Sequence, residues 1–209
     1  MKHLSIGTRT TSIFLILGLL IFVSSFGSYN NDDVRLNVES NHSTIQFYVP
    51  ISNGITRISG KFTDYTMDIA YDSINFANSK ISVIINSESI NTGIAGRDEH
   101  LSTADFFDTE KFPEITFVSE PISANPSGNF TLVGNFTMHG ISKRIEMPLT
   151  ITGKEGKYTV GFSSRLSIDR TEYGVGSDFK HSSMDNFIGN MVAIEIDFWT
   201  KKWKEPKKD

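Results

Sequence analysis

Apolar residues recur at every second position along most of the chain from Val34 onward. A period of two is typical of a β-strand, whose successive side chains point to opposite faces, and not of a helix. The alternation therefore predicts a series of strands, each apolar on one face only. The alternating segments are 45–49, 58–62, 65–69, 81–85, 115–117, 130–138, 145–151, 158–168 and 192–198.

Turn residues separate these segments. Asn53-Gly54 lies between two alternating runs, which is a strong hairpin signal, and His139-Gly140 interrupts a later pair. Short connections join antiparallel neighbours, so we predict an all-β fold of about eight to ten antiparallel strands. Strands with one apolar face must bury those faces together, in a sandwich or in a closed barrel. We favour the barrel because closure leaves no exposed strand edge.

The alternation stops in two places. The stretch Gly93–Asp108 is charged and contains phenylalanines, and we expect it to form one or two short helices that cap a barrel end. The stretch 171–190 contains three glycines and is expected to form the other rim. Long connections with their own apolar residues often carry function.

The first residues resemble a secretory signal peptide. Lys2 and Arg9 precede an apolar run at 13–23, which small residues follow. The alternative is an uncleaved membrane anchor, but the run is shorter than the roughly 20 residues of a spanning helix. We therefore predict a cleaved signal peptide at 1–27, one barrel domain at 28–200, a basic tail at 201–209, and a periplasmic or secreted protein.

Charge narrows the expected partners. The chain has a formal net charge of −4 and no basic stripe, so we expect no nucleic acid partner. The C-terminal tail is basic and has tryptophans beside it. It is expected to make at most a transient contact with an anionic membrane surface, or to be a solvated end. The residues concerned are Lys201, Lys202, Lys204, Lys207 and Lys208, with Trp199 and Trp203.

The usual catalytic motifs are missing from the sequence. It contains no cysteine, no nucleophile elbow, no metal-binding helix motif and no phosphate-cradling loop. We therefore predict a protein that is not an enzyme and has no catalytic residues, metal or cofactor. The run 97–100 could place Arg97 or His100 at the polar end of a ligand, or could be a solvated turn. The rival hypothesis is an enzyme for a lipid-like substrate with Asp98 and His100 as acid and base.

Phenylalanine is abundant, with 16 in the chain, and many lie on the predicted apolar faces. An eight-stranded barrel is either filled by side chains or has room for one ligand. Gly60 and Gly134 remove volume from apolar faces, which favours a cavity. A filled barrel that serves as a structural or interaction module remains the alternative. The expected lining residues are Phe47, Phe62, Phe106, Phe107, Phe117, Leu132, Phe136 and Phe162.

Several ordered motifs resemble the YceI-like family of exported bacterial proteins. They are His42-Ser43 with Phe47, and the segments 60–62, 96–101, 105–108, 112–117, 134–143, 168–170 and 173–175. The resemblance implies a lipocalin-like barrel, a bound polyisoprenoid lipid as ligand, periplasmic residence and a homodimer. It also implies that Arg97, Asp98 and His100 lie near the cap of the cavity and not in a catalytic centre. The segment 176–189 matches none of these motifs.

Overall fold

The computed structural model describes residues 33–202 except 73, 125–128, 183 and 185–186. The chain divides into two units, residues 1–31 and 32–209, and all described residues belong to the second. The predicted signal peptide and residues 203–209 of the predicted tail lie outside the described residues.

The second unit consists almost entirely of strands, with one α-helix and five short 3-10 turns among the described residues. The strands are β1 (Asp33–Val38), β2 (Thr44–Ile51), β3 (Thr56–Phe62), β4 (Tyr65–Asp72), β5 (Lys80–Asn86), β6 (Ile90–Asn91), β7 (Glu114–Ser119), β8 (Ser123–Ala124), β9 (Phe130–Met138), β10 (Ile141–Glu155), β11 (Thr159–Asp169) and β12 (Met191–Lys202). The helix is α1 (Ala95–Ser102), and the 3-10 turns are η2 (Ser40–His42), η3 (Ser52–Gly54), η4 (Phe76–Asn78), η5 (Ser87–Ser89) and η6 (Arg170–Tyr173).

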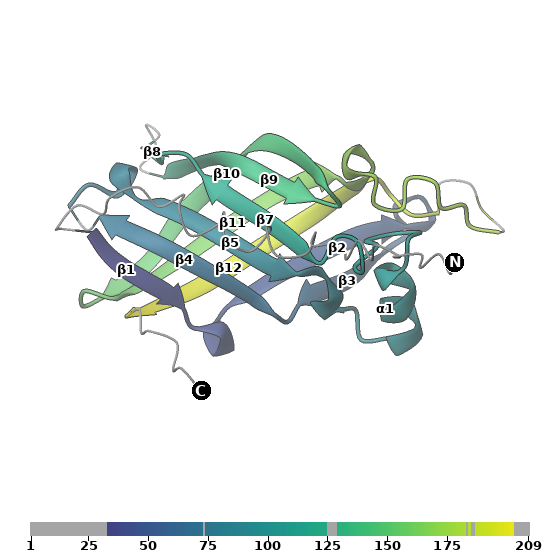
Figure 1. The fold of residues 1–209 in the computed structure, drawn as a ribbon, viewed down its shortest axis with the longest axis horizontal. Helices are drawn as coiled ribbons and strands as arrows, with labels where there is room; N and C mark the ends of the chain where they lie inside the picture. The colour runs from purple at the N-terminus through teal and green to yellow at the C-terminus, as the bar shows by residue number, and fades with distance from the viewer. Residues whose placement is uncertain (1–32, 73, 125–128, 183, 185–186, 203–209) are drawn as a thin grey trace, which may run out of the picture. The chain divides into compact units, whose positions relative to one another are not determined.

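Eight strands form a closed antiparallel barrel in the order β1, β4, β5, β7, β9, β10, β11 and β12, and β12 pairs back to β1 (Figure 1). The predicted lipocalin-like barrel is therefore confirmed. The predicted helical stretch contains a single helix, α1, which is followed by turns.

Three further strands extend the barrel at one end. The long strand β12 pairs with β1 near its C-terminal end and with β2 along residues 193–197. β3 pairs with β2, and β6 pairs with β3. β1 and β2 both pair with β12, so they form one long strand that the turn η2 interrupts. Such interruptions explain why the structure has more strand segments than the closed barrel has strands.

Strand direction places the long connections at one end of the barrel. In an up-and-down barrel, every second connection lies at the same end, and those after β2, β6, β9 and β11 do so here. The Ser52 amide donates to the Phe187 carbonyl at 2.8 Å, and the His100 and Phe179 rings lie 5.5 Å apart. We call this end the mouth. The expectation that 171–190 forms the other rim is wrong, because β6 and β11 end at the same side.

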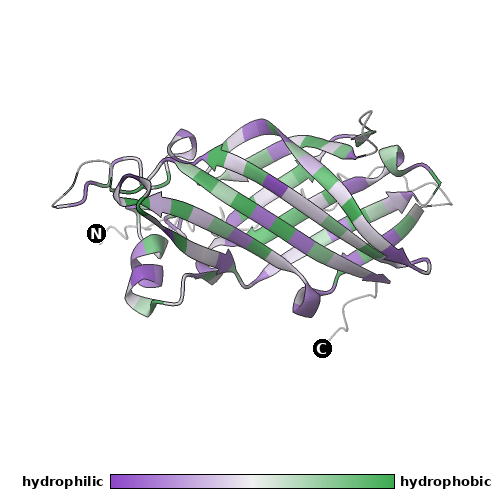
Figure 2. Cartoon of the chain, turned by 180° about the vertical axis from the view of Figure 1, so that it is seen from behind, coloured by the Kyte–Doolittle hydropathy of each residue, from purple (hydrophilic) through white to green (hydrophobic). Residues whose placement is uncertain are grey.

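The apolar faces point into the barrel, as the alternation predicts, and Figure 2 shows the alternating hydrophilic and hydrophobic bands along the strands. The end opposite the mouth is filled, and we call it the packed end. There η4 places Phe76 against Phe162, with ring centroids 5.6 Å apart, and Phe162 stacks on Phe198 at 4.9 Å. Phe162 is 1% exposed. These rings close the barrel interior at this end.

Candidate ligand-binding cavity

A cavity of about 290 Å³ lies inside the barrel between the mouth and the packed end. Aliphatic and aromatic side chains from strands on every side of the barrel form nearly all of its wall. A few residues with polar side chains also line it: Gln46, Thr92, Arg97, His100, Ser164, Arg170 and His181. Concave, mostly apolar cavities with a few polar groups are typical of sites for small apolar ligands.

Nine of the ten residues predicted from the sequence line this cavity: Phe47, Phe62, Arg97, His100, Phe106, Phe107, Phe117, Leu132 and Phe136. Phe162 does not; it belongs to the stack at the packed end. The alternation correctly gave its inward direction but could not show at which height the barrel is filled. That these residues contact a ligand remains a prediction.

Most of the aliphatic residues of the wall were not among the predicted lining residues. Ile194 on β12 is one example: it lies opposite Leu166 of β11 on one side and Phe47 of β2 on the other. The period of two in 192–198 marks such residues as inward. Phe179 and Phe187 also line the cavity, but they come from the irregular segment 171–190, where no periodicity indicates direction.

The two glycines on the inner faces do not leave empty space. A β-carbon at Gly60 would overlap the ring of Phe47, its partner across β2 and β3. A β-carbon at Gly134 would overlap the ring of Phe117 and the carbonyl of Val118. The argument that these glycines enlarge a cavity is therefore wrong, because aromatic rings of neighbouring strands cover them.

The helix α1 is attached to the barrel through Thr92. The Arg97 guanidinium donates to the Thr92 hydroxyl at 2.7 Å and to the Thr92 carbonyl at 3.0 Å. The Asp98 carboxylate accepts the Thr92 amide at 2.9 Å and also pairs with the Thr92 hydroxyl. These side chains thus fix the start of the helix at the mouth, and they are not merely a solvated turn.

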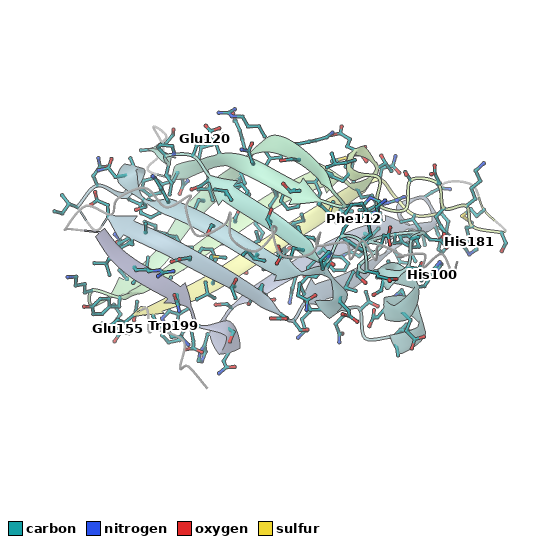
Figure 3. The ribbon with its side chains drawn as sticks, in the orientation of Figure 1. His100, Phe112, Glu120, Glu155, His181 and Trp199 are labelled. Carbon is teal, nitrogen blue, oxygen red and sulfur yellow. The ribbon has the colours of Figure 1, made fainter. Side chains whose placement is uncertain are left out.

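His100 lies at the mouth between two aromatic rings and a carboxylate. Its Nε2 is 3.0 Å from the Asp105 carboxylate, and its ring meets the Phe106 and Phe179 rings edge-on at 5.1 and 5.5 Å. Figure 3 shows His100, Phe112 and His181 at the mouth and Glu155 and Trp199 at the other end. His100 therefore pairs with Asp105, whereas the carboxylate of Asp98 is engaged by Thr92. The proposed acid and base do not form a pair.

Arg170 is a buried cation that holds the irregular part of the mouth together. It is 9% exposed and donates to four main-chain carbonyls at 2.6 to 3.1 Å, those of Val175, Gly176, Ile188 and Gly189. Burial lowers the pKa of its guanidinium, which nevertheless stays charged. Arg170 also lines the cavity, but its hydrogen bonds show a structural role that the sequence did not reveal.

Little else in the described part of the chain indicates chemistry. Among the described residues whose pKa is shifted, only Arg170 lines the cavity. No cluster of three or more metal-ligating side chains occurs in the described ranges. None of the described helices is both long and apolar enough to cross a membrane.

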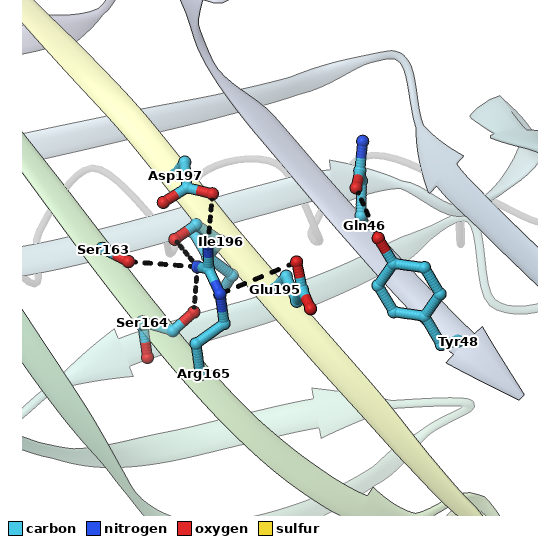
Figure 4. A network of polar contacts seen from close by, with 8 residues as sticks. All are labelled: Gln46, Tyr48, Ser163, Ser164, Arg165, Glu195, Ile196 and Asp197. Carbon is cyan, nitrogen blue, oxygen red and sulfur yellow. Dashed lines mark hydrogen bonds and ion pairs between the residues drawn. The ribbon is translucent and has the colours of Figure 1, made fainter.

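The outer face of the barrel is polar. Arg165 on β11 donates to the Asp197 carboxylate at 2.6 Å and to the Ser163 hydroxyl at 3.1 Å, and Glu195 lies nearby (Figure 4). On β2, the Tyr48 hydroxyl donates to Gln46 at 3.0 Å. Hydrogen bonding to Asp197 raises the pKa of Arg165. The contrast between this face and the cavity defines the inside of the barrel.

A closed barrel of eight strands with an apolar cavity in its interior places the chain in the class of lipocalin-like barrels. The YceI-like domain matches residues 36–199, and the chain belongs to this family. A UPF0312 protein of Yersinia enterocolitica is 30% identical over 179 residues, which cover 84% of this chain and 91% of that protein.

Solved structures share the fold. The YceI protein of Campylobacter jejuni is 26% identical, with a TM-score of 0.63 over 72% of this chain and 88% of that one. BcnA of Burkholderia cenocepacia has a TM-score of 0.69 at 21% identity, covering 78% and 98% of the two chains. A polyisoprenoid-binding domain from Saccharophagus degradans has a TM-score of 0.66 at 14% identity, covering 81% and 99%. The two more distant structures support the fold alone.

Proposed function

We propose that this protein holds a long apolar lipid of the isoprenoid class inside its barrel, as a carrier, store or sensor and without catalysis. The observation that carries the proposal is the cavity of about 290 Å³ with its aliphatic and aromatic wall. A filled barrel that serves only as an interaction module would not contain such a space. The structure from Saccharophagus degradans with the same fold is described as a polyisoprenoid-binding domain, and the proposal carries this ligand class over to the present chain.

Hydrocarbon burial supplies the affinity. Transfer from water into an apolar site gains about 0.8 kcal/mol for each buried methylene group. The wall residues from β12, β11 and β2, such as Ile194, Leu166 and Phe47, offer few polar contacts to a ligand. A slender hydrocarbon chain is therefore favoured over a polar molecule of the same volume.

Export, assembly and membrane contact belong to the same proposal. The apolar run at 13–23 favours a periplasmic or secreted protein, and the family resemblance favours a homodimer. Lys201 and Lys202 lie in β12 where it pairs with β1, at the packed end. A membrane contact through the basic tail would therefore leave the mouth uncovered.

Filling the cavity tests the proposal. Ile194→Trp is expected to lower the affinity for geranylgeraniol, a C20 isoprenoid alcohol, at least tenfold, because the indole occupies the middle of the cavity. The measurement is displacement of the amphipathic fluorescent dye 1-anilinonaphthalene-8-sulfonate. Overpacking is expected to lower the stability by about 1–3 kcal/mol, so a thermal melt must show that the variant is folded.

The matched control is Ile141→Trp. Ile141 is 39% exposed at the start of β10 and does not line the cavity. Its affinity is expected to stay within twofold of that of the unaltered protein. Equal affinities for the two folded variants would place the ligand outside the barrel and contradict the proposal.

A further inference from the structure

One inward position of β11 carries a polar side chain in an otherwise apolar row. Phe162, Leu166 and Ile168 share the inner face of β11 with Ser164. The Ser164 side chain is buried, with the residue only 3% exposed, and its hydroxyl has no hydrogen-bond partner among the residues that the structure describes. Figure 4 shows this hydroxyl on the side of β11 away from the Arg165 guanidinium.

Ser164 lies at the floor of the cavity. Phe162, two residues earlier, belongs to the ring stack of the packed end, whereas Ser164 and Leu166 line the cavity. Among the residues of β11 that line the cavity, Ser164 is therefore the one nearest to the ring stack. Its neighbour across β12 is Ile196, which offers no side-chain hydrogen bond.

An unpaired hydroxyl in this position disfavours the ligand-free state. Buried polar groups are normally hydrogen-bonded, and leaving one without a partner is unfavourable. Alanine would fill nearly the same space without this cost. A serine at the floor is explained if the group that occupies the cavity brings an oxygen to it.

We propose that Ser164 is a specificity-determining residue that hydrogen-bonds an uncharged oxygen, hydroxyl or carbonyl, of the bound lipid. The inference rests on the proposed function and narrows it: the ligand is an oxygenated isoprenoid and not a pure hydrocarbon. It also fixes the orientation, with the oxygenated end at the floor and the hydrocarbon toward the mouth. A charged head group is disfavoured there, because the arginines that line the cavity, Arg97 and Arg170, lie at the mouth.

The test compares geranylgeraniol with the C20 hydrocarbon that lacks its hydroxyl, in the same dye-displacement measurement. The unaltered protein is expected to prefer the alcohol about fivefold, the ratio for one neutral hydrogen bond of about 1 kcal/mol. In Ser164→Ala this preference is expected to vanish, while the affinity for the hydrocarbon is kept or rises. Ser164→Thr, which keeps the hydroxyl, is expected to retain a preference for the alcohol.

The matched control is Ser163→Ala. Ser163 is the adjacent residue, and its hydroxyl accepts from Arg165 on the outer face, so the preference for the alcohol should not change. Equal binding of the two probes by the unaltered protein, or an unchanged preference in Ser164→Ala, would overturn the inference and leave the proposed function standing. Failure of both probes to bind the unaltered protein would instead contradict the proposed function, and the inference with it.

Discussion

Arg170→Met is expected to lower the free energy of unfolding by about 3 kcal/mol or more, because four carbonyls lose a charged donor and a buried acceptor without a partner costs about 1–3 kcal/mol. The affected carbonyls belong to 175–176 and 188–189, so the irregular segment at the mouth loosens first. For a chain of this size, the melting temperature should fall by roughly 6–12 °C. Thermal unfolding followed by circular dichroism measures the change.

Arg165→Met is the control for the loss of an arginine. Arg165 also makes several hydrogen bonds, but its side chain is 46% exposed and its ion pairs face the solvent. Pairs of this kind contribute about 0–1 kcal/mol. Similar melting temperatures for the two variants would show that Arg170 does not fix the mouth.

Phe162→Ala is expected to lower the free energy of unfolding by about 3–5 kcal/mol, the usual range for a buried phenylalanine. Phe162 is 1% exposed and stacks between Phe76 and Phe198, so the loss leaves a hole that rigid neighbours fill only in part. Urea unfolding measures the change. The same variant is expected to extend the cavity toward the packed end.

Phe179→Ala is the comparison for Phe162→Ala. Phe179 packs on His100 and Phe106 at the mouth, where it is only partly buried and its loss is expected to cost about 1–2 kcal/mol. A smaller loss for Phe162→Ala than for Phe179→Ala would contradict the division into a packed end and an open cavity.

The barrel and the inner faces of its strands could be predicted from the sequence, because alternation is a local property. Ile45, Phe47 and Val49 are one such row, and all three line the cavity. Phe162 shows what alternation cannot predict: its inward direction follows from the pattern, but its place in the packed end depends on Phe76, which a distant turn supplies.

Other features depend on contacts between distant segments. α1 and the segment 171–190 lie at the same end of the barrel because the strands before them, β6 and β11, end at the same side. The pairing of His100 with Asp105 depends on the turn after α1. Gly60 shows that an inner-face glycine need not mean empty space, since Phe47 from the neighbouring strand covers it. Arg170 belongs to the motif 168–170, but its role could not be predicted from the sequence because its partners are main-chain carbonyls.

The most direct test of a lipid inside the barrel is native mass spectrometry of the protein purified from its own host, followed by organic extraction and identification of the lipid. We predict one isoprenoid molecule per chain, with a hydroxyl or carbonyl oxygen, and its loss in Ile194→Trp. A protein that shows only the mass of the bare chain and yields no lipid on extraction would contradict the account.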